Sequence, residues 1–261
     1  MNKRYPPIPS DDIKRFVSIV RRLRRDCPWD REQTHRSIRH SLIEETYEVI
    51  EALDENNLDE LKKELGDLLL HVVMHATMAE QAGEFTLKDV VEGISAKLIR
   101  RHPHVFGTTR VKDIEEIKHN WEKLKLSEGR TSVLDGVPKG MPALQRALRV
   151  QERAAKVGFE WETLRDAHKK VMEEKDELRR SLRRGNAKKK EEELGDYLFA
   201  LVNYARFTRI NPENALRATI EKFVRRFSFV ESTLKKNGKD IHTSSLEEMM
   251  GLWRKAKRNT G

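Results

Sequence analysis

Two short acidic patterns occur twice in the sequence of 261 residues. Glu-Glu-x-x-Glu spans residues 44–48 and 173–177, and Glu-x-x-Asp spans 64–67 and 193–196. The offset is 129 residues for each of the pairs Glu45/Glu174, Glu48/Glu177, Glu64/Glu193 and Asp67/Asp196. A period far above about 50 residues indicates a duplicated domain rather than a solenoid of short repeats.

Carboxylates three residues apart on a helix are neighbours on one face. If the helices carrying the two patterns pack together, four carboxylates converge in each half, and each like-charged pair at about 5 Å costs on the order of 3 kcal/mol at an effective dielectric of roughly 20. A bound cation would remove that cost. Oxygen ligands without cysteine or histidine at matching positions predict Mg²⁺, with Mn²⁺ also possible. The alternative is a solvated acidic helix face, but the recurrence of both patterns favours a metal site.

The residues around these acids are spaced as in amphipathic helices. The first stripe consists of Leu42, Thr46, Val49, Ile50 and Leu53, and the second of Leu61, Leu65, Leu68, Leu69 and Val72. Proline and glycine are scarce, and Asn211-Pro212 is a helix-start signal. We therefore predict an all-α fold of tandem duplicated helical bundles. The Gly- and Pro-containing segment before residue 143 places the domains at 1–130 and 143–261, with a linker at 131–142.

Cationic and aromatic residues also recur, at helical spacing, in both halves. They are Lys97, Arg101, Trp121 and Lys125 in the first half, and Lys222, Arg226, Trp253 and Lys257 in the second. Two cations four residues apart can neutralise a polyphosphate. An indole can stack on a nucleobase or simply pack in a core, and the sequence leaves both roles open.

Composition narrows the function classes. The net charge of +9 suits either nucleic acid or small polyanions. A single cysteine, Cys27, fits a reducing cytosol, and neither a signal peptide nor an 18-residue apolar run is present, so we expect a cytoplasmic protein without a membrane span. A P-loop motif, an adjacent His-Asp pair and a Glu-x-x-His di-iron motif at the acids are absent. The remaining alternative is a helical nucleic-acid-binding or regulatory protein without catalysis, which would bind DNA or RNA in a salt-sensitive way.

The paired acids, the Lys-x-x-x-Arg and Trp-x-x-x-Lys pairs, and the stretches CPWDREQTH (27–35) and RRHPHVFG (100–107) together resemble the MazG family of all-α nucleoside triphosphate pyrophosphohydrolases. The resemblance covers essentially the whole chain. It implies Mg²⁺-dependent hydrolysis of ribo- and deoxynucleoside triphosphates to monophosphate and pyrophosphate, a housekeeping role, and a homodimer. We expect no nucleic-acid partner on this basis.

The resemblance also assigns roles to residues, mainly in the C-terminal repeat. Metal ligands there would be Glu174, Glu177, Glu193 and Asp196, and nucleotide contacts would be Lys189, Glu192, Lys222, Arg226, Trp253 and Lys257. Glu173 or Glu174 would orient or deprotonate the attacking water. In the N-terminal repeat, Glu45, Glu48, Glu64 and Asp67 could hold metal, and Lys97, Arg101, Trp121 and Lys125 form a possible second nucleotide site.

The N-terminal repeat departs from this pattern around its acids. Glu60 stands where the second repeat has Lys189, and Lys63 stands where it has Glu192, which puts nucleotide binding there in doubt. His71 and His75 follow Asp67 at helical spacing, but the second half has Ala200 and Tyr204 at those places. We therefore interpret the two histidines as packing residues or as residues with a role specific to the N-terminal repeat.

Overall fold

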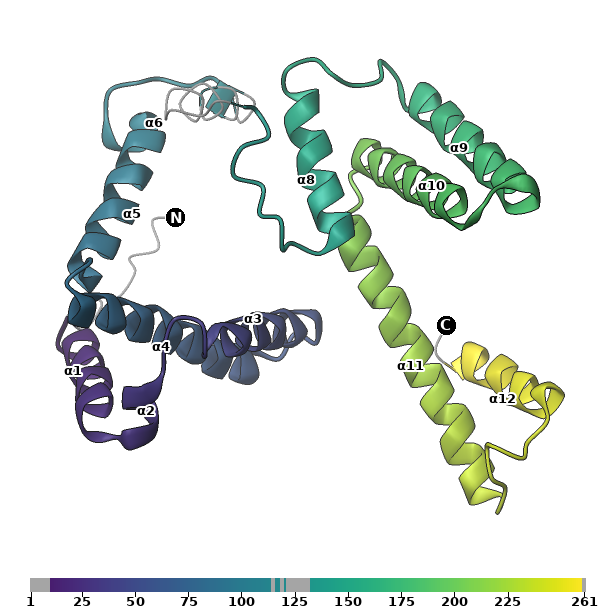
Figure 1. Ribbon diagram of the computed structural model, residues 1–261, viewed down its shortest axis with the longest axis horizontal. Helices are drawn as coiled ribbons and strands as arrows, with labels where there is room; N and C mark the ends of the chain where they lie inside the picture. Colours follow the sequence, from purple (N-terminus) through teal and green to yellow (C-terminus); the bar gives the residue numbers. More distant parts are fainter. Residues whose placement is uncertain (1–9, 114–115, 118–119, 121–131, 260–261) are drawn as a thin grey trace. The chain divides into compact units, whose positions relative to one another are not determined.

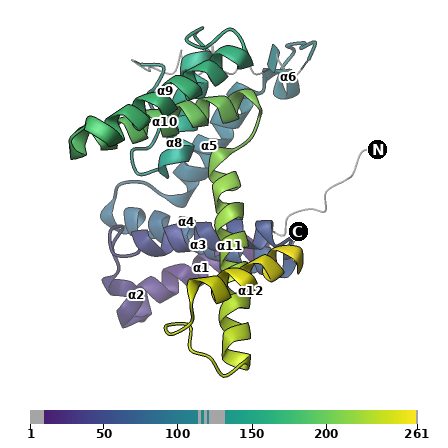
Figure 2. The ribbon, with the colours of Figure 1, turned by 90° about the vertical axis from the view of Figure 1, so that its right-hand side faces the viewer.

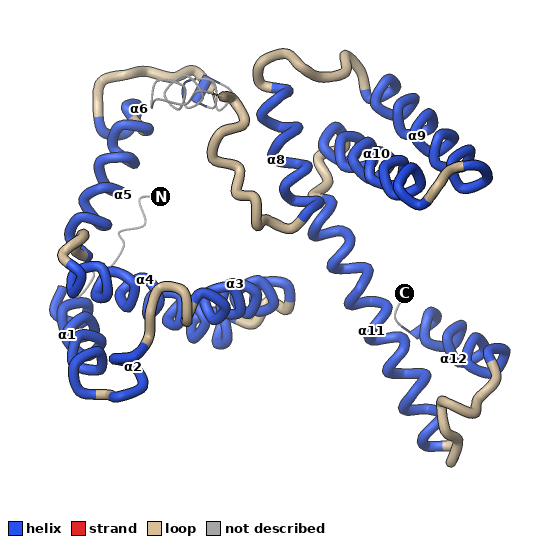
Figure 3. The backbone as a smooth tube through the Cα atoms, in the orientation of Figure 1, coloured by secondary structure: helices blue, strands red, loops and turns tan. Residues whose placement is uncertain are grey.

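The computed structural model describes residues 10–113, 116–117, 120 and 132–259, and every regular element among them is a helix (Figure 3). The chain divides into two compact units, Met1–Leu124 and Lys125–Gly261, each of which is described by itself. The predicted all-α class is confirmed over this part of the chain. None of its helices is both long enough and apolar enough to cross a membrane.

The described part of the first unit contains the following helices, labelled in Figure 1. They are α1 (Ser10–Asp26), α2 (Pro28–Glu32), α3 (Arg39–Asp54), α4 (Leu58–Ala82), α5 (Leu87–Arg101) and α6 (Pro103–Phe106). The second unit contains α8 (Ala143–Ala155), α9 (Leu164–Arg184), α10 (Ala187–Phe207), α11 (Pro212–Lys236) and α12 (Leu246–Asn259).

In each unit, the two acidic patterns lie on consecutive antiparallel helices joined by a short turn: α3 and α4 in the first, α9 and α10 in the second (Figure 1). An asparagine begins the second helix of each pair. The Asn57 side chain accepts a hydrogen bond from the Glu60 amide, and the Asn186 side chain accepts one from the Lys189 amide. Because these caps satisfy backbone donors that a helix start leaves free, they fix where both acid-bearing helices begin.

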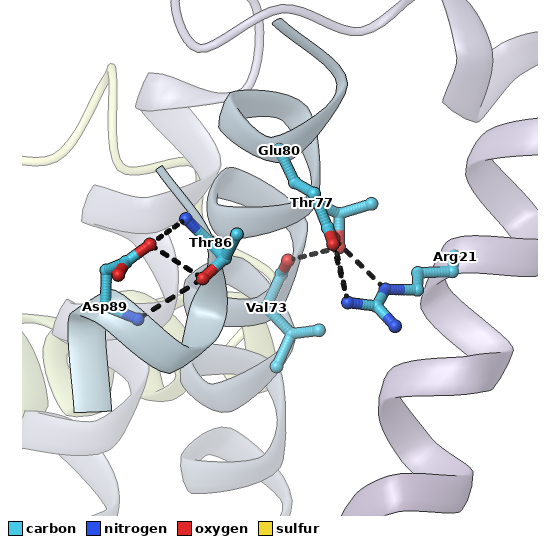
Figure 4. A network of polar contacts seen from close by, with 6 residues as sticks. All are labelled: Arg21, Val73, Thr77, Glu80, Thr86 and Asp89. Carbon is cyan, nitrogen blue, oxygen red and sulfur yellow. Dashed lines mark hydrogen bonds and ion pairs between the residues drawn. The ribbon is translucent and has the colours of Figure 1, made fainter. Parts of the chain in front are cut away.

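The core of the first unit lies between α1 and α4. Val20 of α1 packs with Val73, Met74 and Met78 of α4 and with Ile38. Figure 4 shows polar contacts at the edges of this core: Arg21 of α1 forms an ion pair with Glu80 of α4, with nitrogen and oxygen 2.8 Å apart.

Helix α5 then begins at a capping box in which Thr86 and Asp89 bond reciprocally (Figure 4). The Asp89 carboxylate accepts bonds from the Thr86 hydroxyl and amide, which hold the pKa of Asp89 below its usual value. This reciprocal pair satisfies backbone donors at the start of α5 and fixes where the helix begins.

The second unit has two packing regions. Helix α8 packs on α10 beside the α9–α10 pair, whereas α12 packs on the C-terminal half of α11 (Figures 1 and 2). The α11–α12 contact is built from Val230, Leu234 and Leu252, of which Leu234 is fully buried. Helix α11 begins at Asn211, whose side chain accepts a bond from the Asn214 amide, with Pro212 in the first turn. The Asn-Pro start predicted from the sequence is confirmed.

Candidate active site

In the N-terminal unit, three of the four predicted acids meet between α3 and α4. Carboxylate oxygens of Glu45, Glu48 and Glu64 all lie within 4.8 Å of one another. Glu64 is only 7% exposed. Asp67 stands outside this three-residue group, although its charge acts on Glu45. The predicted convergence is therefore seen for three acids, with the aspartate at the margin.

Two acids of this cluster, Glu45 and Glu64, have a raised pKa and so hold a proton more tightly than ordinary carboxylates do. Burial, followed by hydrogen bonds with Glu60 and Glu48, raises the pKa of Glu64 to about 7. Burial and the neighbouring charges of Glu48 and Asp67 raise the pKa of Glu45. Without a cation, the cluster thus relieves its repulsion by keeping a proton near neutral pH.

The C-terminal unit repeats the arrangement between α9 and α10. Oxygens of Glu174, Glu177 and Glu193 lie within 4.8 Å of one another, and Glu174 and Glu193 are 7% and 6% exposed. Asp196 is again outside the three-residue group. It lines a neighbouring cavity together with Glu174.

Two lysines compensate the charge of this second cluster. Lys170 Nζ is 2.7 Å from Glu174 Oε1 and 2.8 Å from Glu173 Oε1, and Lys189 Nζ is 2.7 Å from Glu193 Oε1. Hydrogen bonds to Glu173 and Glu174 raise the pKa of Lys170, and the bond to Glu193 raises the pKa of Lys189. Sequence reasoning expected Lys189 at the nucleotide; the structure places its ammonium on the acid cluster.

The difference between the two clusters follows from the sequence. Glu60 replaces Lys189 at the corresponding place, and Lys63 pairs with Glu60 at 2.7 Å instead of reaching Glu64. Residue 41, which corresponds to Lys170 at the offset of 129, is a serine. The first cluster therefore has neither of the two lysines of the second.

The donor sets fit a divalent cation. Both groups offer carboxylate oxygens alone, which suit hard cations such as Mg²⁺. In the C-terminal cluster, Glu193 Oε2 is buried and has no hydrogen-bond partner in the described part of the chain. A buried charged oxygen without a partner is costly. Glu193 thus presents a free ligand atom inside a group of three acids.

The structure corrects the predicted orientation of α4. Leu65, Leu69 and Val72 belong to the predicted apolar stripe, which would face α3 if the two helices packed through their stripes. Instead, these apolar side chains are 51%, 41% and 46% exposed, while Glu64 is buried toward α3. The physical reason is that Glu64 and these apolar side chains lie on different sides of α4, so turning Glu64 toward α3 leaves the apolar side chains facing outward.

The remaining predicted nucleotide residues lie on other helices. Lys222 and Arg226 are one turn apart on α11, and Trp253 and Lys257 one turn apart on α12. Trp253 packs against the α11–α12 core, with its ring 5.1 Å from that of Phe223. Trp253 therefore has the core contacts that the sequence left open as one of its two roles.

The possible second nucleotide site is described only in part. Lys97 and Arg101 lie one turn apart on α5, while Trp121 and Lys125 lie outside the described residues. His71 and His75 lie on α4 among buried side chains. His75 Nδ1 is 2.7 Å from His35 Nδ1, and burial lowers the pKa of both α4 histidines, as expected for packed, neutral imidazoles.

Beside the C-terminal cluster lies a cavity of about 550 Å³ between α8, α9, α10 and the loops next to α8. Glu174, Asp196 and Lys170 line one part of it, and Trp161, Phe159 and other apolar groups line the rest. Volumes of 300–1,000 Å³ are typical of small-molecule sites. Sequence reasoning missed this cavity and Lys170, although the four-residue spacing of Lys170 and Glu174 was a readable signal.

A helix pair with clustered carboxylates occurs twice among the described residues and is an arrangement that could hold divalent cations, and comparison with known proteins identifies the family. A model of the MazG nucleotide pyrophosphohydrolase domain matches residues 33–106 and 162–230, the segments that carry both acid clusters. The chain belongs to the MazG family.

Curated relatives align over nearly the full chain. The nucleoside triphosphate pyrophosphohydrolase/pyrophosphatase MazG of Thermotoga maritima is 42% identical over 250 residues, covering 94% of this chain and 95% of that protein. The nucleoside triphosphate pyrophosphohydrolase of Escherichia coli K12 is 42% identical over 257 residues, covering 95% and 98%. The uncharacterized protein YabN of Bacillus subtilis is 46% identical, but the chain spans only 54% of its length.

Proposed function

We propose that this protein hydrolyses nucleoside triphosphates to nucleoside monophosphate and pyrophosphate in a Mg²⁺-dependent reaction at the C-terminal acid cluster. The two relatives of nearly equal length carry the name of this activity. The observation that carries the proposal is that Glu174 and Asp196 line a 550 Å³ cavity, while Glu174 also belongs to the three-acid group. A cation held there would lie next to a space large enough for a nucleotide.

The metal would be held by Glu174, Glu177, Glu193 and Asp196, with Mn²⁺ able to replace Mg²⁺. When bound, the ion supplies Lewis-acid chemistry: it neutralises phosphate oxygens and makes a nearby water more acidic. The chain's own residues do the rest. Glu173 lies beside the cluster and is exposed, so it can accept a proton from the attacking water.

The groups that Lys170 and Lys189 contact would change when a cation binds to the cluster. Before the cation arrives, their ammonium groups balance Glu174 and Glu193. If these carboxylates held a cation, both ammonium groups would be free to turn to the triphosphate and balance its charge. Glu192, Lys222, Arg226, Trp253 and Lys257 are proposed nucleotide contacts by family resemblance.

We assign the broad acceptance of ribo- and deoxynucleotides, the housekeeping role and a cytoplasmic location on the basis of the resemblance. We propose a homodimer on a structural observation as well. Leu65 and Leu69 on α4, Leu194 and Leu198 on α10, and Phe223 on α11 are all between 41% and 55% exposed. Exposed apolar stripes of this kind mark contact surfaces. Sedimentation equilibrium should give twice the chain mass of 30.6 kDa.

The N-terminal cluster is proposed as a second cation site formed by Glu45, Glu48, Glu64 and Asp67. Its nucleotide binding stays open, because Glu60 brings a negative charge where the other repeat has Lys189. Variants that inactivate only one of the two clusters are needed to measure the turnover of each repeat by itself.

The test is pyrophosphate release from ATP and deoxynucleoside triphosphates with Mg²⁺, then with EDTA. Glu193→Gln and Asp196→Asn, each combined with its N-terminal counterpart Glu64→Gln or Asp67→Asn, are expected to abolish turnover while circular dichroism stays helical. Glu191→Gln, an exposed glutamate on the same helix, is the matched control and should retain full turnover. Near-normal turnover in both double variants would refute the assignment, as would turnover that persists in EDTA.

A further inference from the structure

The turn between α9 and α10 lies within a strongly basic segment, residues 179–190, which we call the basic end. It contains seven lysines and arginines and no acid. They are Arg179, Arg180, Arg183, Arg184, Lys188, Lys189 and Lys190. This short segment therefore carries a charge of +7 in a chain whose net charge is +9.

The corresponding segment of the N-terminal repeat has the opposite charge. At the offset of 129 residues, the basic end aligns with residues 50–61, which contain five acids and no lysine or arginine. The acids are Glu51, Asp54, Glu55, Asp59 and Glu60. Both segments form the turn of a helix pair that bears an acid cluster. Because the shared fold does not require either charge, the contrast points to a difference in what approaches the two clusters.

Most cations of the basic end are not neutralised by the protein. Arg179, Arg180 and Lys189 pair with acids of the same helices. The other four form no ion pair in the part of the chain that the structure describes, namely Arg183, Arg184, Lys188 and Lys190. The turn that carries them lies at the end of the helix pair away from α8 (Figures 1 and 2). Their positive charge therefore acts on the surrounding solvent.

The unpaired cations lie close to the acid cluster along the same two helices. Arg184 follows Glu177 by seven residues on α9, and Lys188 precedes Glu193 by five residues on α10. At a rise of about 1.5 Å per residue, these separations are about 10 Å and about 8 Å along the helix axes. The Debye length is about 8 Å at physiological ionic strength and about 30 Å at 0.01 M. At low salt, the field of the basic end thus extends over the acid cluster.

We propose that Arg183, Arg184 and Lys188 attract the triphosphate to the C-terminal cluster through their long-range field, without contacting it. The inference rests on the proposed function, because the triphosphate is the ligand that this field would attract. Charge of one sign beside a site raises the local concentration and the association rate of an oppositely charged ligand, and this gain falls steeply with salt. The N-terminal repeat, with five acids in the same place, lacks this attraction.

The test measures the effect of this charge at two ionic strengths. KM and kcat for pyrophosphate release from ATP, at a fixed Mg²⁺ concentration, are compared between the unaltered protein and Arg183→Gln/Arg184→Gln. Two charges at about 12 Å from a Mg²⁺-bound triphosphate of charge about −2 should lower KM about fivefold at 0.01 M ionic strength. The Gln pair should therefore raise KM about fivefold there and leave kcat unchanged, because the field acts on binding alone. At about 1 M, where the Debye length is about 3 Å, the two KM values should agree within about 1.5-fold.

A binding measurement accompanies the kinetics. The full-length protein with Mg²⁺ is titrated by calorimetry with adenosine 5′-(α,β-methylene)triphosphate, whose α–β bridge resists hydrolysis. The Gln pair should raise the Kd of this analogue at low ionic strength and leave it unchanged at high ionic strength. A purely structural effect of the substitutions would not disappear with added salt.

Lys235→Gln/Lys236→Gln is the matched control. Like the two arginines, these lysines are exposed and lie in the last turn of a helix of the same unit, but at the C-terminal end of α11, beside α12. This control lowers the net charge equally and should leave KM unchanged at both ionic strengths. Arg183→Lys/Arg184→Lys keeps both charges and should keep the unaltered KM. Arg183→Glu/Arg184→Glu reverses them and should raise KM about 25-fold at low salt, the square of the effect of neutralisation.

The inference is overturned if the Gln pair leaves KM unchanged at low salt or raises it equally at both ionic strengths. It is also overturned if the Lys pair at positions 183 and 184, or the control pair on α11, raises KM as much as the Gln pair does. Failure of the proposed function looks different, because the unaltered protein then releases no pyrophosphate from any nucleoside triphosphate. In that case the calorimetric titration still decides whether the basic end attracts a triphosphate.

Discussion

Mg²⁺ binding at the N-terminal cluster should be coupled to the release of a proton. Glu64 is buried against two other glutamates, and its pKa is raised to about 7. A metal ligand must be deprotonated to bind. At pH 7 about half of these clusters carry the proton, and at pH 6 about one cluster in ten is free of it. The apparent affinity for Mg²⁺ should therefore fall about tenfold from its high-pH limit on going to pH 6, and it should level off above pH 8.

The raised pKa of Glu64 also determines whether the free energy of unfolding rises or falls with pH. Glu64 has a higher pKa in the folded state than the value of about 4.3 expected when unfolded, so its protonation favours folding. That contribution is complete below about pH 4.3 and is lost as the pH rises toward 7. Without metal, the N-terminal unit should lose stability across this window, and Mg²⁺ should restore it above pH 7.

The assay uses a protein with Glu193→Gln and Asp196→Asn, so that the C-terminal cluster no longer competes for Mg²⁺. Calorimetric titration at pH 6, 7 and 8, in two buffers of different ionisation enthalpy, gives both the affinity and the number of protons released. Adding Glu64→Gln is the control and should remove the pH dependence along with most of the binding. A Mg²⁺ affinity that is constant from pH 6 to pH 8, with no proton released, would refute the reasoning.

Two further predictions concern single side chains. Lys189→Met leaves Glu193 without its ammonium partner, so the melting temperature measured in EDTA should fall. In saturating Mg²⁺, the difference in melting temperature from the unaltered protein should be smaller. An equal fall under both conditions would contradict the charge-balancing role of Lys189. Leu234→Ala removes a fully buried side chain from the α11–α12 core and should cost about 2–5 kcal/mol in urea unfolding, whereas a loss below about 1 kcal/mol would show that α12 does not depend on this contact.

Much of the fold could be predicted because its signals are local. Helical spacing, the scarcity of proline and the start at Asn211-Pro212 depend on neighbouring residues, and the structure confirms them. The duplication was equally readable, because the offset of 129 residues preserves the acids of both repeats. Convergence of the acids was predicted correctly for Glu174, Glu177 and Glu193, whose positions follow from the pairing of two consecutive helices.

What could not be predicted depends on the rotation of one helix against another and on contacts between distant segments. Sequence spacing does not say whether Glu64 or Leu65 faces α3, since both choices leave an amphipathic helix. The cavity is built from loops and helices that are separated in sequence, so no single motif predicts that Gln151 and Trp161 line it. The domain boundaries drawn at 130 and 142 stay a prediction.

The repulsion among the clustered carboxylates is relieved differently in the two repeats, by lysines in one and by a bound proton in the other. The C-terminal acids are balanced by Lys170 and Lys189, so a cation bound there would displace ammonium groups. The N-terminal acids lack those lysines, so a cation bound at Glu64 would displace a proton. Exchange of an ammonium group keeps positive charge beside the site, where a triphosphate can use it, whereas a released proton leaves nothing behind. For this reason we expect the C-terminal cluster to bind a metal and a polyanion together more readily than the N-terminal cluster does.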